Sequence, residues 1–292
     1  MTMTTKISKY FAVIALVVGF ATTTAAETVG DSTVITPATR MFMLQAGYVS
    51  LLDTYLSPLT YTGTSARLGF ERLQANPSGR WVQELDLNAE LDMTENPAGN
   101  HTAQNMNFGV MWSIMHKWQP ASLPRWRFMA GPAVMTNAGT LYNSYNSNNV
   151  VSARAETNVG INAIVAYNTH LGNRPLTLSY HATLPVAGVF FSPQYDEAYY
   201  EIYVGHHSRL THFGWWGNRF NLIHSLNADL RLPSGLTLRV GYGGNIATSW
   251  WGNISTRNFT HNIVLGIGGE WITLSPGKKN INSKIVSPLY EY

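Results

Sequence analysis

The segment WVQELDLNAELD, residues 81–92, decides the fold class of this chain. Apolar residues from Trp81 to Leu91 recur at every second position, interrupted only by Gln83. The positions between them carry acids and an amide from Glu84 to Asp92. Because side chains alternate between the two faces of a strand, this strand has one apolar face and one polar face. Five polar groups cannot lie against lipid, so we expect the polar face to line a lumen or meet water.

The same alternation of period two recurs along the chain at membrane-spanning length. Residues 153–167 place Arg154 and Glu156 on the face opposite Val159, and residues 220–232 repeat the pattern with His224 as an exception on the apolar face. Strands that cross a bilayer need about 9–11 tilted residues. We predict ten strands at residues 40–50, 66–73, 81–92, 106–118, 125–141, 153–167, 176–188, 220–232, 236–250 and 259–274.

The composition favours a membrane barrel over a soluble β-fold. Charged residues make up 12% of the chain and aromatic residues another 12%, whereas a soluble domain has about 25% charged residues. A soluble sandwich or lipocalin-like barrel also alternates, but it buries its apolar face and shows a more charged surface. We therefore expect an all-β fold, a transmembrane antiparallel up-and-down β-barrel of about ten strands, with twelve as the alternative, in the bacterial outer membrane.

The N-terminus has the pattern of an export signal. Lys6 and Lys9 precede the apolar run Tyr10–Phe20, and small residues up to Ala26 precede a cleavage point. The chain has no cysteine, so we expect neither disulfides nor a lipoprotein anchor. The predicted organisation is a signal peptide at 1–26, an N-terminal segment with the first strand at 27–62, the barrel at 63–274, and a basic tail at 275–292.

The predicted connections orient the barrel. Short turns are expected at 76–79, 170–174 and 233–235, and longer connections at 93–102, 142–149, 251–257 and, as one long outer loop, 189–218. Short turns of such barrels lie on the periplasmic side. Lumenal charges are expected to pair across a narrow interior, although a path for a small solute is the alternative. Asp53 is expected to stabilise a turn or cap rather than to catalyse a reaction.

The outer loop contains the candidate binding residues. We predict that Tyr195, Tyr199, Tyr200, Glu201 and Arg219 bind a ligand, within a recognition surface that extends from residue 190 to residue 216. The expected partners are outer-membrane lipids and lipopolysaccharide, and a small molecule or protein at the outer loops. The net charge of +3 is too small to indicate a protein that binds nucleic acid, so we expect no nucleic-acid partner.

Metal and cofactor sites are not predicted. His206, His207 and His212 lie close in sequence to Asp196, but their spacing matches no recognised metal site. The sequence therefore predicts neither a metal ion nor a cofactor.

A second hypothesis is catalytic and involves Ser208, His206 and Asn218. His206 and Ser208 share a face if this segment is a strand, so the imidazole could accept the serine proton while Asn218 orients it. This arrangement resembles outer-membrane phospholipase A and, in its His-x-Ser part, the lipid A 3-O-deacylases. The resemblance implies hydrolysis of an acyl ester at the membrane surface. The ten residues from Ser208 to Asn218 are fewer than that family usually has, and the alternative is that these are merely loop residues.

A wider resemblance covers residues 51–274. The run LLDTYLSPLTYTG at Leu51–Gly63 is similar to the opening of a family of uncharacterised outer-membrane proteins from Bacteroidota, a domain of unknown function. Further similar stretches are Leu141–Ser144, Ser147–Asn149, Gly188–Pro193, Tyr199–Ile202, Leu238–Tyr242 and Gly269–Ile272. The resemblance implies a barrel, a signal peptide and a Bacteroidota-like source, and it implies no activity.

Overall fold

The computed structural model describes residues 28–29, 32–145, 150–195, 197–198, 200, 204, 210–271 and 283–291. Ten strands of this part of the chain form a closed barrel in which every neighbouring pair is antiparallel. They are β3 (Ala38–Asp53), β4 (Ser57–Ala75), β5 (Trp81–Glu95), β6 (Thr102–Trp118), β7 (Trp126–Asn143), β8 (Val151–Leu171), β9 (Arg174–Phe191), β11 (Arg219–Arg231), β12 (Leu236–Trp251) and β13 (Ile254–Trp271).

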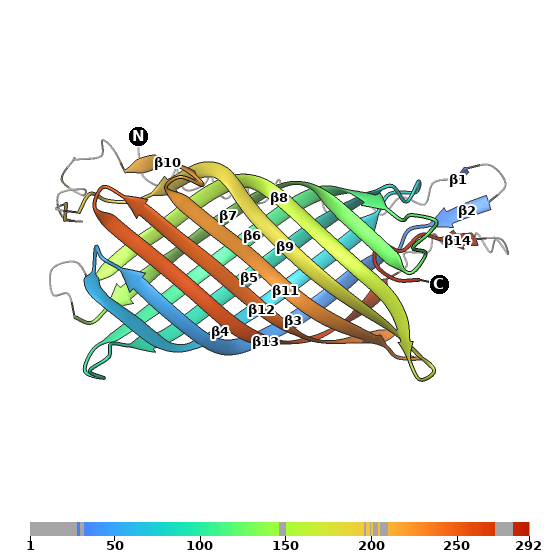
Figure 1. Ribbon diagram of the computed structural model, residues 1–292, viewed down its shortest axis with the longest axis horizontal. Coiled ribbons are helices and arrows are strands. Elements are labelled where there is room, and N and C mark those ends of the chain that lie inside the picture. The colour runs from blue at the N-terminus through green and yellow to red at the C-terminus, as the bar shows by residue number, and fades with distance from the viewer. Residues whose placement is uncertain are drawn as a thin grey trace.

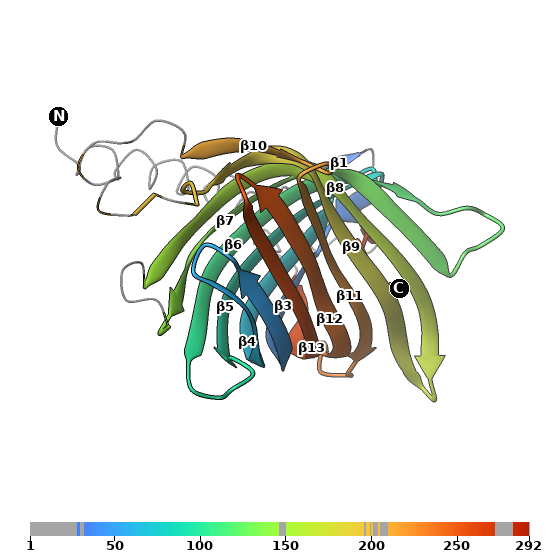
Figure 2. The same cartoon turned by 60° about the vertical axis from the view of Figure 1, so that its left-hand side comes forward.

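The barrel closes between its last and first strands. The β13–β3 ladder runs without interruption from the pair Trp271 and Ala38 to the pair Thr256 and Asp53. The strands are long and steeply tilted, and they curl into one wall (Figures 1 and 2). The prediction of an all-β, antiparallel up-and-down barrel with ten strands is confirmed. Among the described residues, no helix has both the length and the apolar character needed to cross a membrane.

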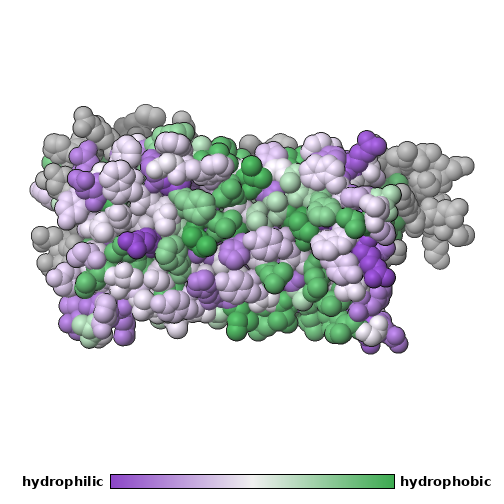
Figure 3. All heavy atoms as spheres, in the orientation of Figure 1, coloured by the Kyte–Doolittle hydropathy of each residue, from purple (hydrophilic) through white to green (hydrophobic). Residues whose placement is uncertain are grey.

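The two faces of the wall differ in polarity as the alternation predicts. Outward side chains such as Leu68, Phe108 and Ile263 are 63–66% exposed, whereas the lumenal Glu84 and Asp92 are 4% and 0% exposed. Figure 3 shows apolar side chains gathered along the middle of the wall and polar ones toward its ends. Exposed tryptophans lie near both ends, as in the aromatic girdles of membrane barrels: Trp81, Trp118, Trp126 and Trp271 at one end, and Trp215, Trp216 and Trp250 at the other.

The two ends of the barrel are distinguished by their connections. The terminal end, where β3 begins and β13 ends, carries the connections 76–80, 119–125, 172–173 and 232–235. The loop end carries the connections 54–56, 96–101, 144–150 and 252–253, together with residues 192–210 between β9 and the short strand β10 (Thr211–Trp215).

One expected long connection at the loop end is in fact a tight hairpin. Residues 251–257 were expected to form a longer polar connection, but Trp251 pairs with Ile254 in the β12–β13 ladder. Only Gly252 and Asn253 remain between the strands, with φ of 54° and 66°. Glycine and asparagine tolerate this left-handed conformation, which the favoured two-residue hairpin turns require. The prediction of a longer connection was therefore wrong.

A second correction concerns the outer loop 189–218. Residues 189–191 belong to β9, and β10 pairs antiparallel with Ala187–Phe191. The cause lies at Pro185, which has no N–H to donate to a ladder and lies beside a bulge at Val186. The β9–β11 ladder ends at Thr183, and above it β9 pairs with β10 instead of β11. The expected single loop is therefore partly strand.

The C-terminal segment, Ser283–Glu291, lies at the terminal end. It begins with β14 (Ser283–Ile285), which pairs in parallel with β2 (Ser32–Ile35), and β2 pairs with β1 (Thr28–Val29). Its Leu289 and Tyr290 are 0% and 1% exposed. They join an apolar cluster with lumenal side chains from β4 to β8, namely Leu73, Ala75, Val82, Met115, Met129, Ile164 and Ala166. The C-terminal segment thus fills the terminal end of the lumen.

Candidate functional site

Polar contacts fix the C-terminal segment inside the barrel wall. The Leu289 carbonyl accepts from Asn168 Nδ2 at 3.2 Å, and the Tyr290 carbonyl accepts from the Arg127 guanidinium. The Tyr290 hydroxyl donates to Asp229 Oδ2 at 3.1 Å. Burial, together with the Asp229 carboxylate, raises the pKa of Tyr290 well above its usual range. Tyr290 therefore stays protonated and keeps this donor role.

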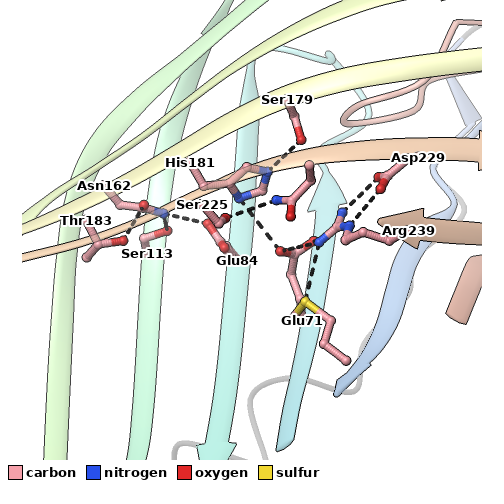
Figure 4. Close-up of polar contacts among 12 residues, drawn as sticks. Glu71, Glu84, Ser113, Asn162, Ser179, His181, Thr183, Ser225, Asp229 and Arg239 are labelled. Carbon is pink, nitrogen blue, oxygen red and sulfur yellow. Dashed lines mark hydrogen bonds and ion pairs between the residues drawn. The ribbon is translucent and has the colours of Figure 1, made fainter. Parts of the chain in front are cut away.

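Above the C-terminal segment lies a central ion-pair cluster, formed by Glu71, His181, Asp229 and Arg239. The fully buried Arg239 donates to Asp229 through Nε at 2.7 Å and Nη2 at 2.8 Å, a bidentate pair. Its Nη1 donates to both oxygens of Glu71 at 3.1 and 3.2 Å. His181 Nδ1 lies 3.7 Å from Glu71 Oε2 (Figure 4). The cluster confirms that lumenal charges pair across the interior.

A central cavity of about 90 Å³ adjoins this cluster. Its lining includes Glu71, Glu84 and His181 together with Asn162 and Asn227. Asn162 of β8 bonds to three other strands, and its Nδ2 donates to Glu84 Oε2 of β5 at 2.5 Å and to Ser113 Oγ of β6 at 2.9 Å. Its Oδ1 accepts from Thr183 Oγ1 at 2.9 Å. The middle of the lumen is thus a polar, largely bonded layer.

A larger loop-side cavity, of about 160 Å³, occupies the other half of the lumen. Three ion pairs lie in its wall, and each joins an arginine to an acid on another strand. Arg154 Nη2 lies 3.2 Å from Asp53 Oδ2, Arg67 Nη1 lies 3.9 Å from Glu90 Oε2, and Arg219 pairs with Glu156. The cavity wall is therefore strongly polar, and these three pairs balance, while the exposed Arg257 adds one further positive charge to the lining.

One side of the loop-side cavity is aromatic. Phe190 and Trp251 both line it, and their ring centroids lie 6.4 Å apart. The Arg219 guanidinium lies 5.0 Å from the centre of the Phe190 ring. His212 of β10 packs against Trp251 with ring centroids 4.5 Å apart. The short strand β10 therefore supports this aromatic wall.

Asparagine side chains make another part of the same cavity wall polar. The Oδ1 atoms of Asn221, Asn245 and Asn258, on the adjacent strands β11, β12 and β13, are buried and have no hydrogen-bond partner in the described part of the chain. All three line the loop-side cavity. A buried acceptor without a partner costs about 1–3 kcal/mol. These oxygens are therefore positioned to accept hydrogen bonds from a molecule in the cavity.

The predicted binding residues fall in different places. Arg219 lines the loop-side cavity, whereas Tyr195 and Tyr200 lie in the β9–β10 connection and are 58% and 75% exposed. Tyr199 and Glu201 lie outside the described residues. The sequence thus indicated one cavity residue, Arg219, and two residues at the loop end.

The predicted catalytic residues are only partly described. His206 and Ser208 lie outside the described residues, so the acyl-hydrolase hypothesis stays a prediction. Asn218 lies in the β10–β11 turn, where its Oδ1 accepts from the Trp215 N–H at 2.9 Å and its Nδ2 donates to the Phe213 carbonyl at 3.0 Å. In this structure its amide holds the turn.

Asp53 has the turn role that the sequence indicates. Its Oδ1 accepts from the Tyr55 N–H at 3.1 Å, as in an Asx-turn. The turn brings Tyr55 inward, and the Tyr55 hydroxyl donates to the Glu197 carbonyl at 2.8 Å.

The lumenal asparagines and the C-terminal segment were not predicted as a site. The polar face of β11, β12 and β13 was the signal for these asparagines, whereas the C-terminal segment shows no such pattern.

A family model described as "Protein of unknown function (DUF3316)" matches residues 10–279. The chain belongs to this family. This confirms the predicted membership in a family of unknown function, while the Bacteroidota-like source and the likeness to phospholipase A stay predictions. No curated protein sequence matches the chain.

Several solved structures of bacterial proteins have some similarity to this DUF3316 protein. The β domain of the Bordetella autotransporter Brka has 11% identity and a TM-score of 0.41, covering 80% of this chain and all (100%) of that one. The outer membrane protease OmpT from Escherichia coli has 8% identity and a TM-score of 0.44, covering 81% and 97%. The translocator domain of NalP from Neisseria meningitidis has 10% identity and a TM-score of 0.38, covering 91% and 96%. Similarities this low say nothing about activity.

Proposed function

We propose that this protein is a bacterial outer-membrane barrel that binds a small, neutral, hydroxyl-rich molecule in the loop-side cavity and is closed to free passage. The observation that carries the proposal is the division of the lumen. The C-terminal segment and the central ion-pair cluster fill the terminal half, whereas a cavity of about 160 Å³ remains in the loop half.

The outer-membrane location is supported by the apolar outer face and the lengths of the strands. The barrel strands have 13 to 21 residues, more than the 9–11 that cross a bilayer. Only a closed barrel lets strands satisfy every backbone group in lipid. Fractionation of cell envelopes on a density gradient tests the location. Recovery of the folded protein with outer-membrane porins is expected, and recovery in the soluble fraction would contradict it.

The chemistry of the loop-side cavity defines the class of ligand. The three arginine–acid pairs balance, and the exposed Arg257 is the one further charged residue in the described part of the lining, so most of the charge in the cavity wall is already neutralised. The unpartnered oxygens of Asn221, Asn245 and Asn258 require donors, which hydroxyl groups supply. The ring of Trp251 provides an apolar surface beside them. The cavity volume equals that of about five waters, comparable with a single sugar ring.

Ligand binding is measured on the mature chain folded in detergent micelles. Saturation-transfer NMR compares neutral monosaccharides with an acidic and a basic sugar of the same size. We expect a neutral sugar to bind at one site and Asn258→Leu to weaken its affinity at least tenfold. Asn262→Leu is the matched control, because Asn262 lies on the same strand but lines the central cavity. No binding by any neutral sugar, or equal losses in the two variants, would refute the proposal.

The predicted aromatic residues of the outer loop belong to the same proposal. The exposed Tyr195 and Tyr200 lie at the loop end, where a ligand enters. We expect Tyr195→Ala with Tyr200→Ala to slow association of the sugar, measured by rapid-mixing fluorescence of Trp251. Unchanged association with changed dissociation would instead place these rings in the bound state.

A further inference from the structure

Glu71, Glu84 and His181 form a compact group of potential metal ligands, here called the carboxylate–histidine trio. They belong to β4, β5 and β9, and one ligand atom of each lies within 4.8 Å of the others. All three residues are more than nine-tenths buried. Donor atoms around one ion bonded at about 2.0–2.2 Å lie roughly 3–4 Å apart, so the trio needs only a small adjustment to share an ion.

Each member of the trio is oriented by a neighbour on its other side (Figure 4). Ser179 Oγ lies 3.2 Å from His181 Nε2, which leaves Nδ1 toward Glu71. Asn162 Nδ2 donates to Glu84 Oε2, and Arg239 Nη1 donates to Glu71. Metal-binding histidines and carboxylates are usually held by such outer hydrogen bonds. The trio is therefore prearranged rather than merely adjacent.

The charges around the trio are not balanced. Arg239 is shared between Glu71 and the bidentate partner Asp229. Glu84 has no ion-pair partner among the residues that the structure describes, and its bonded neighbour Asn162 is neutral. A buried carboxylate is costly unless it is paired, coordinates a metal, or takes up a proton. A divalent cation between Glu71 and Glu84 would supply the missing charge.

An independent feature of the same cavity also calls for a ligand. The Oδ1 of Asn227 is buried, the residue is 3% exposed, and this oxygen has no partner in the described part of the chain. Ser225 pairs directly with His181 in the β9–β11 ladder, so Asn227 is the diagonal neighbour of His181 on the lumenal face. Amide oxygens are good ligands for hard and borderline cations. The cavity volume of about 90 Å³ leaves room for roughly three waters to complete the coordination.

We propose that the carboxylate–histidine trio, with Asn227 nearby, binds one divalent first-row transition-metal ion such as Mn²⁺ or Zn²⁺. One imidazole nitrogen among oxygen donors distinguishes such an ion from Ca²⁺ and Mg²⁺, which prefer oxygen alone. The site lies between the loop-side cavity and the C-terminal segment, so it is separate from the proposed ligand site. Sequence spacing could not indicate it, because the three ligands come from three strands.

The test is metal binding to the mature full-length protein, folded in detergent after treatment with EDTA. Equilibrium dialysis with Mn²⁺, read by electron paramagnetic resonance, gives the stoichiometry and the affinity. We expect one ion per chain, and at least a tenfold loss of affinity in His181→Gln and in Glu84→Gln. Glu90→Gln is the matched control, because it removes a lumenal acid of the same strand as Glu84 that lies outside the trio.

X-ray absorption of the Zn²⁺-loaded wild-type protein provides a test that does not depend on variants folding. It is expected to show a single imidazole nitrogen with oxygen neighbours. Absence of stoichiometric binding, a spectrum without imidazole, or an equal loss in Glu90→Gln would overturn the proposal. The last outcome would mean that the acidic lumen attracts cations without a defined site. Sugar binding by the loop-side cavity is measured separately, so either proposal can fail alone.

Discussion

Replacing Arg239 with methionine is expected to lower the free energy of unfolding by about 3–5 kcal/mol. Arg239 is fully buried and makes four hydrogen bonds of 2.7–3.2 Å to the oxygens of Asp229 and Glu71. Methionine fills much of the same volume but leaves two carboxylates without their cation. The cost therefore comes mainly from the acids left behind, not from a cavity.

The size of this effect follows from the burial of the partners. Asp229 is 0% and Glu71 4% exposed, so bulk solvent does not reach these carboxylates to compensate for the lost guanidinium. Loss of one member of a buried ion pair costs about 3–5 kcal/mol, which lowers the folding equilibrium constant roughly a hundred- to several thousand-fold. If the uncompensated charge is the cause, adding Asp229→Asn to Arg239→Met should recover at least half of the loss. Replacing both partners by neutral groups is known to be tolerated far better than removing one.

Urea-dependent folding and unfolding in lipid vesicles, followed by tryptophan fluorescence, measures these free energies. EDTA is present throughout, so that no bound cation compensates for the missing arginine. Arg239→Lys is the control, because it keeps the charge but not the bidentate geometry. A loss below about 1 kcal/mol for Arg239→Met, or a double variant as unstable as the single one, would refute the assignment of Arg239 as the cation that stabilises the lumenal acids.

Four further outcomes are expected. Truncation after Ile285 removes Leu289 and Tyr290 from the terminal end, and planar-bilayer recordings should then show a larger single-channel conductance than the full chain; equal conductance would mean that the C-terminal segment does not close the lumen. Tyr290→Phe loses only the hydroxyl that donates to Asp229, and urea titration should show a loss of about 1.5–3 kcal/mol. Leu68→Arg places a charge on the outer face near the middle of β4, and folding into vesicles should weaken by about 2–4 kcal/mol; no effect would contradict a lipid-facing Leu68. Gly252→Val adds a branched side chain at φ 54° and should cost about 1–2 kcal/mol by the same titration.

The barrel was predictable because one rule governs every strand of its wall. Lipid outside and a polar lumen inside force alternation with period two, and residues 81–92 display that rule without reference to any other part of the chain. The structure places Glu84 and Asp92 inside and Met93 outside, in agreement with the alternation. The number of strands followed, because each alternating segment is one crossing.

The errors arose where local backbone chemistry overrides alternation. Trp251–Arg257 looked like a polar loop because Asn, Ser, Thr and Arg are frequent there, yet the Gly252–Asn253 pair permits a two-residue turn and extends both strands. Strand β10 was missed because its pairing depends on where Pro185 ends the β9–β11 ladder. Turn residues and a single proline thus set strand boundaries that the periodicity of the sequence does not determine.

The candidate site was harder to predict, because its parts come together only in the closed barrel. The C-terminal segment is too short to show a period, and Tyr290 contacts Arg127 and Asp229, which lie 163 and 61 positions away in the sequence. Glu71 and His181 meet only because β4 and β9 face each other across a lumen of ten strands. Alternation says that a residue points inward, but it does not say which residue it meets there.

The arrangement of the filled and hollow halves also determines how a ligand can move. In the described part of the chain, the C-terminal segment fills the terminal end of the lumen and the central ion-pair cluster lies above it, so we expect a ligand to reach the loop-side cavity from the loop end. On the proposed function, a ligand would enter and leave by this end, where the exposed Tyr195 and Tyr200 lie in the β9–β10 connection. Binding without passage is what this geometry permits in the full chain, and passage would require the C-terminal segment to leave the barrel.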